Sequence, residues 1–350
     1  MILRESFDDF LRNRVNLNPT RLDRIRSAHR SVRAVLKADA DLAPDYLGTF
    51  LQGSYAQGTG TRSPNGDVYD VDVVLALDLE DDWGNLPSGW SVLNDVADAL
   101  DADPLYAGKI EIRDRCVRVA YSNDGMDFHL DVLPAHAPDG TKEPLQIPRD
   151  WRWTDPRGFK DWMDAKNRDG CGLLRRVIRL LKYWRSVQEL GSPNSMVLTT
   201  LAGLHLPKSV SPAGAVDDAL VQTMEGIAGW ATDASAWSVP EIPNPSMEEE
   251  NLARAWSAAD WRAFRDAIRA AADNAREARG TTDEEEAVSL WNGPDLFDGT
   301  FPTTLRGLGE GHRQRSAAFV GGGLAVGGDG CVGSPSGRFV RPNRGFYGDS

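Results

Sequence analysis

The sequence predicts an α+β protein with two lobes, in which a small mixed sheet lies opposite a helical lobe. Two observations support this fold class. Strand and helix patterns alternate from residue 46 to residue 134, whereas only helical periodicity follows from about residue 158. We therefore divide the chain into a sheet-bearing core with an N-terminal helix (1–155), a helical lobe (156–302) and a flexible Gly-rich tail (303–350).

The sheet-bearing core begins with a predicted helix over 17–36, which is rich in arginine and carries its apolar residues on one stripe. The segment YDVDVVLAL at 69–77 is the strongest strand prediction, because it is β-branched and apolar and contains no Pro or Gly. The other predicted elements are a strand over 46–52, a helix over 90–100, two strands within 109–121 and a strand over 128–133.

The second half contains predicted helices over 172–190, 194–206 and 251–277. The acidic run Glu248–Glu250 favours the start of the third of these helices, because carboxylates stabilise a helix N-terminus. Thr282 and Glu285 predict a capping box for a fourth helix. The 11 Trp residues are expected mainly in the core.

The overall charge limits the class of ligand. The formal net charge is −13, whereas proteins that grip long nucleic acids usually present a basic face to the phosphates. We therefore expect small ligands carried in with metal, and no stable complex with a long nucleic acid. The N-terminus lacks the long apolar segment of a secretory signal, and no apolar run approaches the ~20 residues of a membrane span. We expect a cytoplasmic protein without a membrane anchor.

Two aspartates mark the strand over 69–77 as a candidate metal site. Asp70 and Asp72 are two residues apart, so both carboxylates project from the same face of the strand. Neighbouring carboxylates repel one another, and a divalent cation with oxygen ligands removes this conflict. A DxD pair alone is weak evidence, because most such pairs are solvated acids.

A third acid lies in a later apolar strand, the FHLDVL segment at 128–133. Asp131 is costly in this apolar setting unless something compensates its charge. If the two strands are neighbours, Asp131 converges with Asp70 and Asp72. Such a cluster can hold two Mg²⁺ ions ~4 Å apart for in-line phosphoryl transfer, and Mn²⁺ is expected to substitute. The three acids are our catalytic and metal-binding candidates.

Two further features fit a phosphate ligand. Gly53-Ser54 ends the first predicted strand, where Gly permits close approach of the backbone and Ser adds a hydroxyl donor. On the helix over 172–190, Arg175, Arg179 and Lys182 share one face. That basic stripe is either a triphosphate ligand or an ordinary solvated face, and spacing alone does not decide between them.

These motifs together resemble a known family. The segments LQGSYAQGTGTR, DVYDVDVVLAL and FHLDVLPA are similar to the cGAS/DncV-like nucleotidyltransferases (CD-NTases) of bacteria, within the polymerase β-like superfamily. The segments RRVIRLLKYWRS, SPNSMVLTTLAGLHL and DEEEAVSLWNGPDLFDGTFP resemble the helical lobe of that family. The resemblance covers roughly residues 20–302 and implies a polymerase β-like core with a helical lobe.

The resemblance also implies roles. Asp70, Asp72 and Asp131 would be the magnesium ligands, and Gly53 and Ser54 would bind the triphosphate. Lys182 and Ser195 would be the contacts of the helical lobe to the phosphates. The implied reaction is cyclic oligonucleotide synthesis in CBASS antiphage defence. In it, nucleoside triphosphates, ATP among them, are condensed into a cyclic di- or trinucleotide with release of pyrophosphate. The product would activate a separately encoded effector protein.

Two alternatives remain open from the sequence. One is a linear nucleotidyltransferase acting on RNA, protein or a small molecule, since the same acids would serve that reaction. The other is a catalytically inactive nucleotide-binding regulator on the same fold. The intact acid trio argues against the regulator, because an inactive site has no reason to keep a repulsive cluster.

Overall fold

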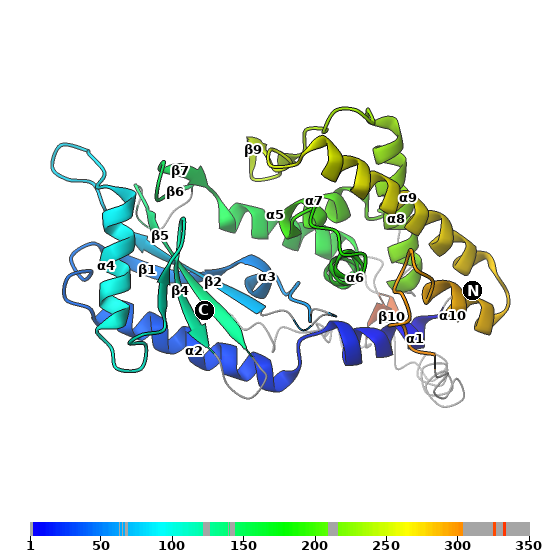
Figure 1. The fold of residues 1–350 in the computed structure, drawn as a ribbon, viewed down its shortest axis with the longest axis horizontal. Helices are drawn as coiled ribbons and strands as arrows, with labels where there is room; N and C mark the ends of the chain where they lie inside the picture. The colour runs from blue at the N-terminus through cyan, green and yellow to red at the C-terminus, as the bar shows by residue number, and fades with distance from the viewer. Residues whose placement is uncertain are drawn as a thin grey trace.

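The computed structural model describes residues 3–303 and the short segments 325–326 and 332–333; within 3–303 it leaves out 63, 65, 67–68, 122–126, 139, 141–143 and 209–215. The expected flexible tail at 303–350 lies almost entirely outside the described residues. Figure 1 shows a sheet-bearing half and a helical half side by side along the longest axis. This arrangement confirms the predicted α+β fold class.

The sheet-bearing half follows the order expected from the sequence. Its elements are α2 (Pro19–Ala38), β1 (Tyr46–Gln52), α3 (Gly53–Ala56), β2 (Tyr69–Leu77), α4 (Gly89–Asp101), β3 (Ile110–Ile112), β4 (Val117–Tyr121), β5 (Phe128–His136), β6 (Leu145–Ile147) and β7 (Arg152–Thr154). The predicted strands β1 and β2 are confirmed with the expected bounds. The hairpin of β6 and β7 was not predicted.

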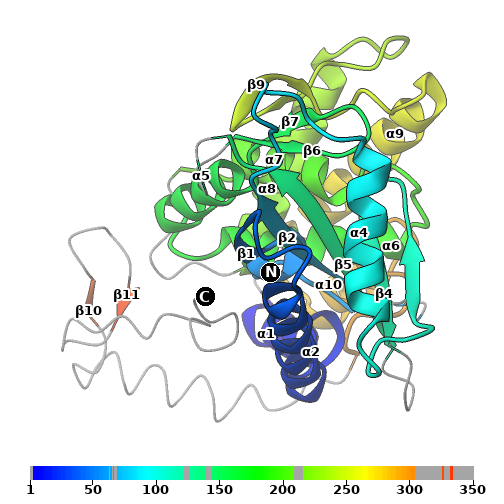
Figure 2. The ribbon, with the colours of Figure 1, turned by 90° about the vertical axis from the view of Figure 1, so that its left-hand side faces the viewer.

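The strands form one mixed sheet in the order β1-β2-β5-β4-β3, with β6 paired to β5 and β7 to β6. β2 and β5 run parallel, and the other neighbouring pairs are antiparallel. One face of β2, with Val71, Val73 and Leu75, is fully buried in a core shared with α2 and α4. α2 runs along the lower edge of the molecule in Figure 1, and α4 stands in front of the sheet in Figure 2. Since one face is closed, polar side chains of β2 are confined to the other.

The helical half contains the following elements: α1 (Arg4–Phe10), η1 (Leu11–Val15, a π-helical turn), α5 (Pro156–Asp169), α6 (Leu174–Val187), α7 (Ser195–His205), α8 (Val216–Asp233), β8 (Pro243–Asn244), β9 (Met247–Asn251), α9 (Ala258–Gly280) and α10 (Glu284–Trp291). Two further short strands are β10 (Ala325–Val326) and β11 (Val332–Gly333). Within the described residues, no helix combines the length and the apolar character needed to cross a membrane.

The N-terminal segment 3–15 packs in the helical core, although the sequence assigned it to the sheet-bearing unit. Phe7 contacts Trp291 and Phe301, with ring centroids 4.8 Å apart in each case. The Leu3 amide also donates to the buried carboxylate of Asp217 on α8. The chain therefore starts in the helical half and crosses to the sheet half through η1 and α2, which ties the two halves together.

Two sequence predictions for the helical half are wrong in detail. Glu248–Glu250 lie in β9 and do not start a helix, because α9 begins at Ala258 behind a capping box of Ser257 and Asp260. α10 is capped by Asp283, whose side chain accepts from the Glu286 amide, and not by Thr282. In both places a stronger cap, one with its oxygen aligned to the N3 amide, lies close by in the sequence.

We expect Phe7→Ala to destabilise the helical half, because it removes a fully buried ring from an aromatic cluster. The loss should be about 3–5 kcal/mol of unfolding free energy, measured by urea denaturation. Trp83→Ala is the matched control, since Trp83 is 86% exposed. An equal loss in the two variants would contradict this packing.

Candidate active site

The parallel pairing of β2 with β5 brings the predicted acids together. Asp72 lies directly opposite Asp131, and Asp70 lies opposite His129. Both pairs are on the sheet face that is not covered by α2 and α4. The two strands are therefore neighbours, which was the condition for Asp131 to converge with Asp70 and Asp72.

The three acids differ in their surroundings. The Asp70 side chain is 52% exposed, whereas that of Asp131 is only 13% exposed. Burial, together with the charges of Asp131 and Asp70, raises the pKa of Asp72 to about 7. A carboxylate that ionises so reluctantly lacks sufficient positive charge nearby. This environment suits a divalent cation by the chemistry of its donors.

A positive side chain already occupies part of this cluster. Arg118 of β4 lies opposite Asp131 in the sheet. Its Nε and Nη2 atoms donate to the two Asp131 oxygens at 2.7 Å each, and Nη2 reaches Asp70 at 3.2 Å. In this arrangement no three His, Cys, Asp or Glu side chains of the described residues are disposed to hold a metal ion. No sequence pattern points to Arg118, because its role depends on strand order.

The Gly53-Ser54 turn approaches the acids from β1. Gly53 has φ of +67°, and a Cβ atom there would overlap the Asp72 carboxylate. Glycine is therefore required both by the backbone conformation and by the space. The Ser54 hydroxyl lies 3.1 Å from the Tyr69 hydroxyl, at the start of β2. The turn continues into α3, a single helical turn.

A cavity of about 410 Å³ joins this turn to the helical half. From the sheet half it is lined by Gly53, Ser54, Gln57, Thr59, Gly60, Thr61, Tyr69, Asp70 and Asp72. From the helical half it is lined by Phe159, Lys182, Arg185, Ser186, Ser195 and Met196. Six of the seven predicted site residues therefore line one cavity, and the seventh, Asp131, lies beside Asp72 on β5.

Lys182 is a buried cation on the helical side of this cavity. It is 4% exposed, and its Nζ lies 3.2 Å from Thr59 Oγ1. Burial, together with the charge of Arg185, lowers the pKa of Lys182 to about 7. Burial and the neighbouring Arg185 both disfavour the positively charged form of Lys182. An anion in the cavity would therefore stabilise the ammonium form.

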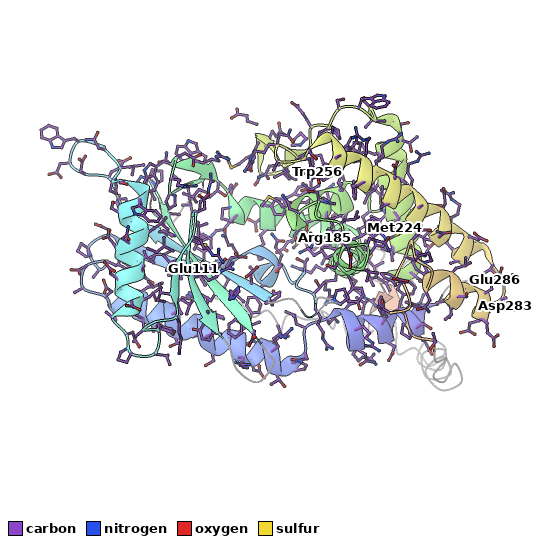
Figure 3. All side chains as sticks on the ribbon, viewed as in Figure 1. Glu111, Arg185, Met224, Trp256, Asp283 and Glu286 are labelled. Atoms are coloured by element: carbon purple, nitrogen blue, oxygen red, sulfur yellow. The ribbon has the colours of Figure 1, made fainter. Side chains whose placement is uncertain are left out.

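The rest of the basic stripe serves structure instead. Arg175 binds Asp164 and the Gln57 carbonyl, and Arg179 binds Asn16. Neither lines the cavity. Arg185, which the sequence analysis missed, does line it and lies near the middle of the molecule on α6 (Figure 3). Its position three residues after Lys182, on the same helix face, was the available signal.

Comparisons with known proteins show which family and which fold this chain resembles. Residues 1–167 match the family model of the Second Messenger Oligonucleotide or Dinucleotide Synthetase domain. The chain is 27% identical to a c-di-GMP synthase of Roseivirga ehrenbergii, over 69% of each protein. It is 26% identical to a cyclic AMP-AMP-AMP synthase of an Acinetobacter species, over 83% of each.

Among solved structures, the chain is similar to the CD-NTase CdnG of Bradyrhizobium diazoefficiens in complex with GTP. The TM-score is 0.69 at 19% identity, covering 85% of this chain and 96% of that one. At this identity the likeness establishes the fold alone. The aligned 85% of the chain includes residues of both halves.

We expect Gly53→Ala to abolish nucleotide turnover, because the new methyl group displaces Asp72. Gly108→Ala is the matched control, since Gly108 also has positive φ (+73°) but open space around it. Each substitution should cost roughly 1 kcal/mol of backbone strain. Thermal unfolding and pyrophosphate release, measured on both variants, separate strain from displacement. Equal activity in the two variants would contradict the clash.

Proposed function

Because the chain is a cGAS/DncV-like nucleotidyltransferase (CD-NTase), we propose that it condenses nucleoside triphosphates into a cyclic di- or trinucleotide and releases pyrophosphate. The observation that carries this proposal is the single cavity that joins Asp70 and Asp72 to Ser54, Lys182 and Ser195. One ligand in this cavity would contact the carboxylates on one side and Ser54, Lys182 and Ser195 on the other. The relatives that match this chain make cyclic dinucleotides or trinucleotides.

The triphosphate would be held from both halves. Gly53 allows the phosphates to approach the backbone, and the Ser54 hydroxyl donates to them. Lys182 and Ser195 would bind the phosphates from the helical half, with Arg185 as a further cation. A ligand that needs both walls binds only when the two halves face each other, which orients its α-phosphate toward the acids.

Asp70, Asp72 and Asp131 would hold the Mg²⁺ ions. The raised pKa of Asp72 supports this assignment, because the carboxylate has too little positive charge around it. When bound, the ions would supply charge neutralisation at the phosphates and activation of the attacking hydroxyl. The protein's own contribution is to fix the three carboxylates on two adjacent strands, so that little reorganisation is needed during the reaction.

The biological role follows from the proposed product. A cyclic nucleotide would act as a second messenger in antiphage defence and would activate a separately encoded effector. ATP is expected among the substrates. The substrates also fit the expected cytoplasmic location, since nucleoside triphosphates are abundant there.

A product assay tests the reaction. The purified protein is incubated with the four labelled nucleoside triphosphates and Mg²⁺ or Mn²⁺, treated with phosphatase, and analysed by chromatography and mass spectrometry. We expect a phosphatase-resistant cyclic product, and at least a 10³-fold loss in Asp72→Asn if the metal contributes several kcal/mol. Asp95→Asn on α4 is the control, because it lies outside the cavity. A product that is only linear or linked to an acceptor would favour the linear transferase, and nucleotide binding without turnover would favour the inactive regulator.

We expect Lys182→Met to weaken nucleotide binding by about tenfold or more, because it removes a buried charge-assisted contact to the phosphates. Without nucleotide, the unfolding temperature of Lys182→Met should be equal to or higher than that of the wild type, since burial disfavours the charged lysine. Lys160→Met on α5 is the control, because the Lys160 side chain is 38% exposed and its ammonium pairs with Asp164. Binding of a fluorescent triphosphate and thermal unfolding measure the two effects. Wild-type affinity in Lys182→Met would rule out its role.

A further inference from the structure

Arg118 is the one cation that directly contacts two of the acids in the described structure. The contact to Asp131 is two-pronged, with both distances at 2.7 Å, and the contact to Asp70 is single and longer at 3.2 Å. The guanidinium is largely buried, with 18% of the side chain exposed. A two-pronged arginine–carboxylate pair of this length is among the stronger ionic contacts in proteins.

This contact competes with a metal for the same oxygens. Both Asp131 oxygens accept from Arg118, and the Asp70 oxygen that Arg118 reaches also lies 3.4 Å from His129. A divalent cation bound by these acids would lie next to a fixed positive charge.

We propose that Arg118 is a built-in counter-ion that neutralises the acid cluster before metal arrives and lowers the affinity of the cluster for that metal. This inference rests on the metal-binding role that the proposed function gives to the acids. In the metal-free protein the guanidinium offsets the repulsion between Asp70, Asp72 and Asp131. Of its two contacts, the one to Asp70 is longer and more exposed, so a metal would displace Arg118 from Asp70 more readily than from Asp131. Arg118 is thus a positioning residue that acts through Asp131.

The consequence for affinity has a definite sign. Removing the positive charge leaves the carboxylates unshielded, so the acids attract a divalent cation more strongly. A unit charge several ångströms from a divalent ion, partly screened by solvent, changes the dissociation constant by about tenfold. The same removal leaves Asp131 and Asp70 of the metal-free protein without this counter-charge, so that form loses stability.

The test measures Mn²⁺ binding to the full-length protein by electron paramagnetic resonance, with no nucleotide present. Arg118→Gln should bind Mn²⁺ about tenfold more tightly than the wild type. Arg118→Lys, which restores the charge, should return most of the way to the wild-type affinity. Arg113→Gln is the control, because it removes the same charge from an exposed pair with Glu111 on the same β3–β4 hairpin, and the affinity for Mn²⁺ should not change.

Thermal unfolding in chelator and in Mn²⁺ provides a second readout. Arg118→Gln should unfold at a lower temperature than the wild type in chelator, and the gap should narrow or close in Mn²⁺. An equal drop under both conditions, with unchanged Mn²⁺ affinity, would overturn the proposal and leave Arg118 a merely structural residue. Weaker Mn²⁺ binding in Arg118→Gln would overturn it as well.

Asp72→Asn separates this inference from the proposed function. If Asp72→Asn binds Mn²⁺ as tightly as the wild type, the acids are not the metal site, and both proposals fail. If Asp72→Asn loses Mn²⁺ but Arg118→Gln binds no better than the wild type, only the counter-ion role of Arg118 fails.

Discussion

The repulsion between carboxylates on two adjacent parallel strands is the constraint on which the rest of the site depends. Asp72 and Asp131 are direct neighbours across β2 and β5, and Asp70 is two residues away on the same face. The opposite face of these strands is fully buried under α2 and α4, so the acids have no alternative orientation. The rigid hydrophobic face therefore maintains an arrangement that would otherwise relax by moving the acids apart.

The surrounding residues each relieve part of this strain. Arg118 binds Asp131 and Asp70 from β4, and the absence of a side chain at Gly53 leaves room for the Asp72 carboxylate. Lys182 contributes a weak, buried positive charge from α6. The helical half holds Lys182 in place through its own core, to which the N-terminal segment 3–15 also belongs. Bound metal would neutralise the remaining negative charge of the carboxylates, and substrate phosphates would neutralise Lys182.

Much of the fold and the site could be predicted from local patterns. β2 is β-branched and apolar apart from Asp70 and Asp72, and the shared face of these two acids follows from the two-residue period of a strand. α5 and α8 were not predicted, since α5 buries only Phe159, Met163 and Asn167 and α8 is interrupted by two glycines. Arg118 and Arg185 were missed for another reason. The importance of Arg118 comes from strand order, which no local pattern encodes. Arg185 shares a helix face with Lys182, but only the meeting of the two halves places it in the cavity.

The central claim is that the acids of the sheet and the cations of the helical half bind one triphosphate together with metal. The most direct measurement is a crystal structure with Mn²⁺ and a non-hydrolysable nucleoside triphosphate, using the anomalous scattering of manganese to locate the ions. The account predicts manganese peaks between Asp70, Asp72 and Asp131, with the triphosphate lying between Ser54 and Lys182. Manganese away from these carboxylates, or a triphosphate bound outside this cavity, would contradict it.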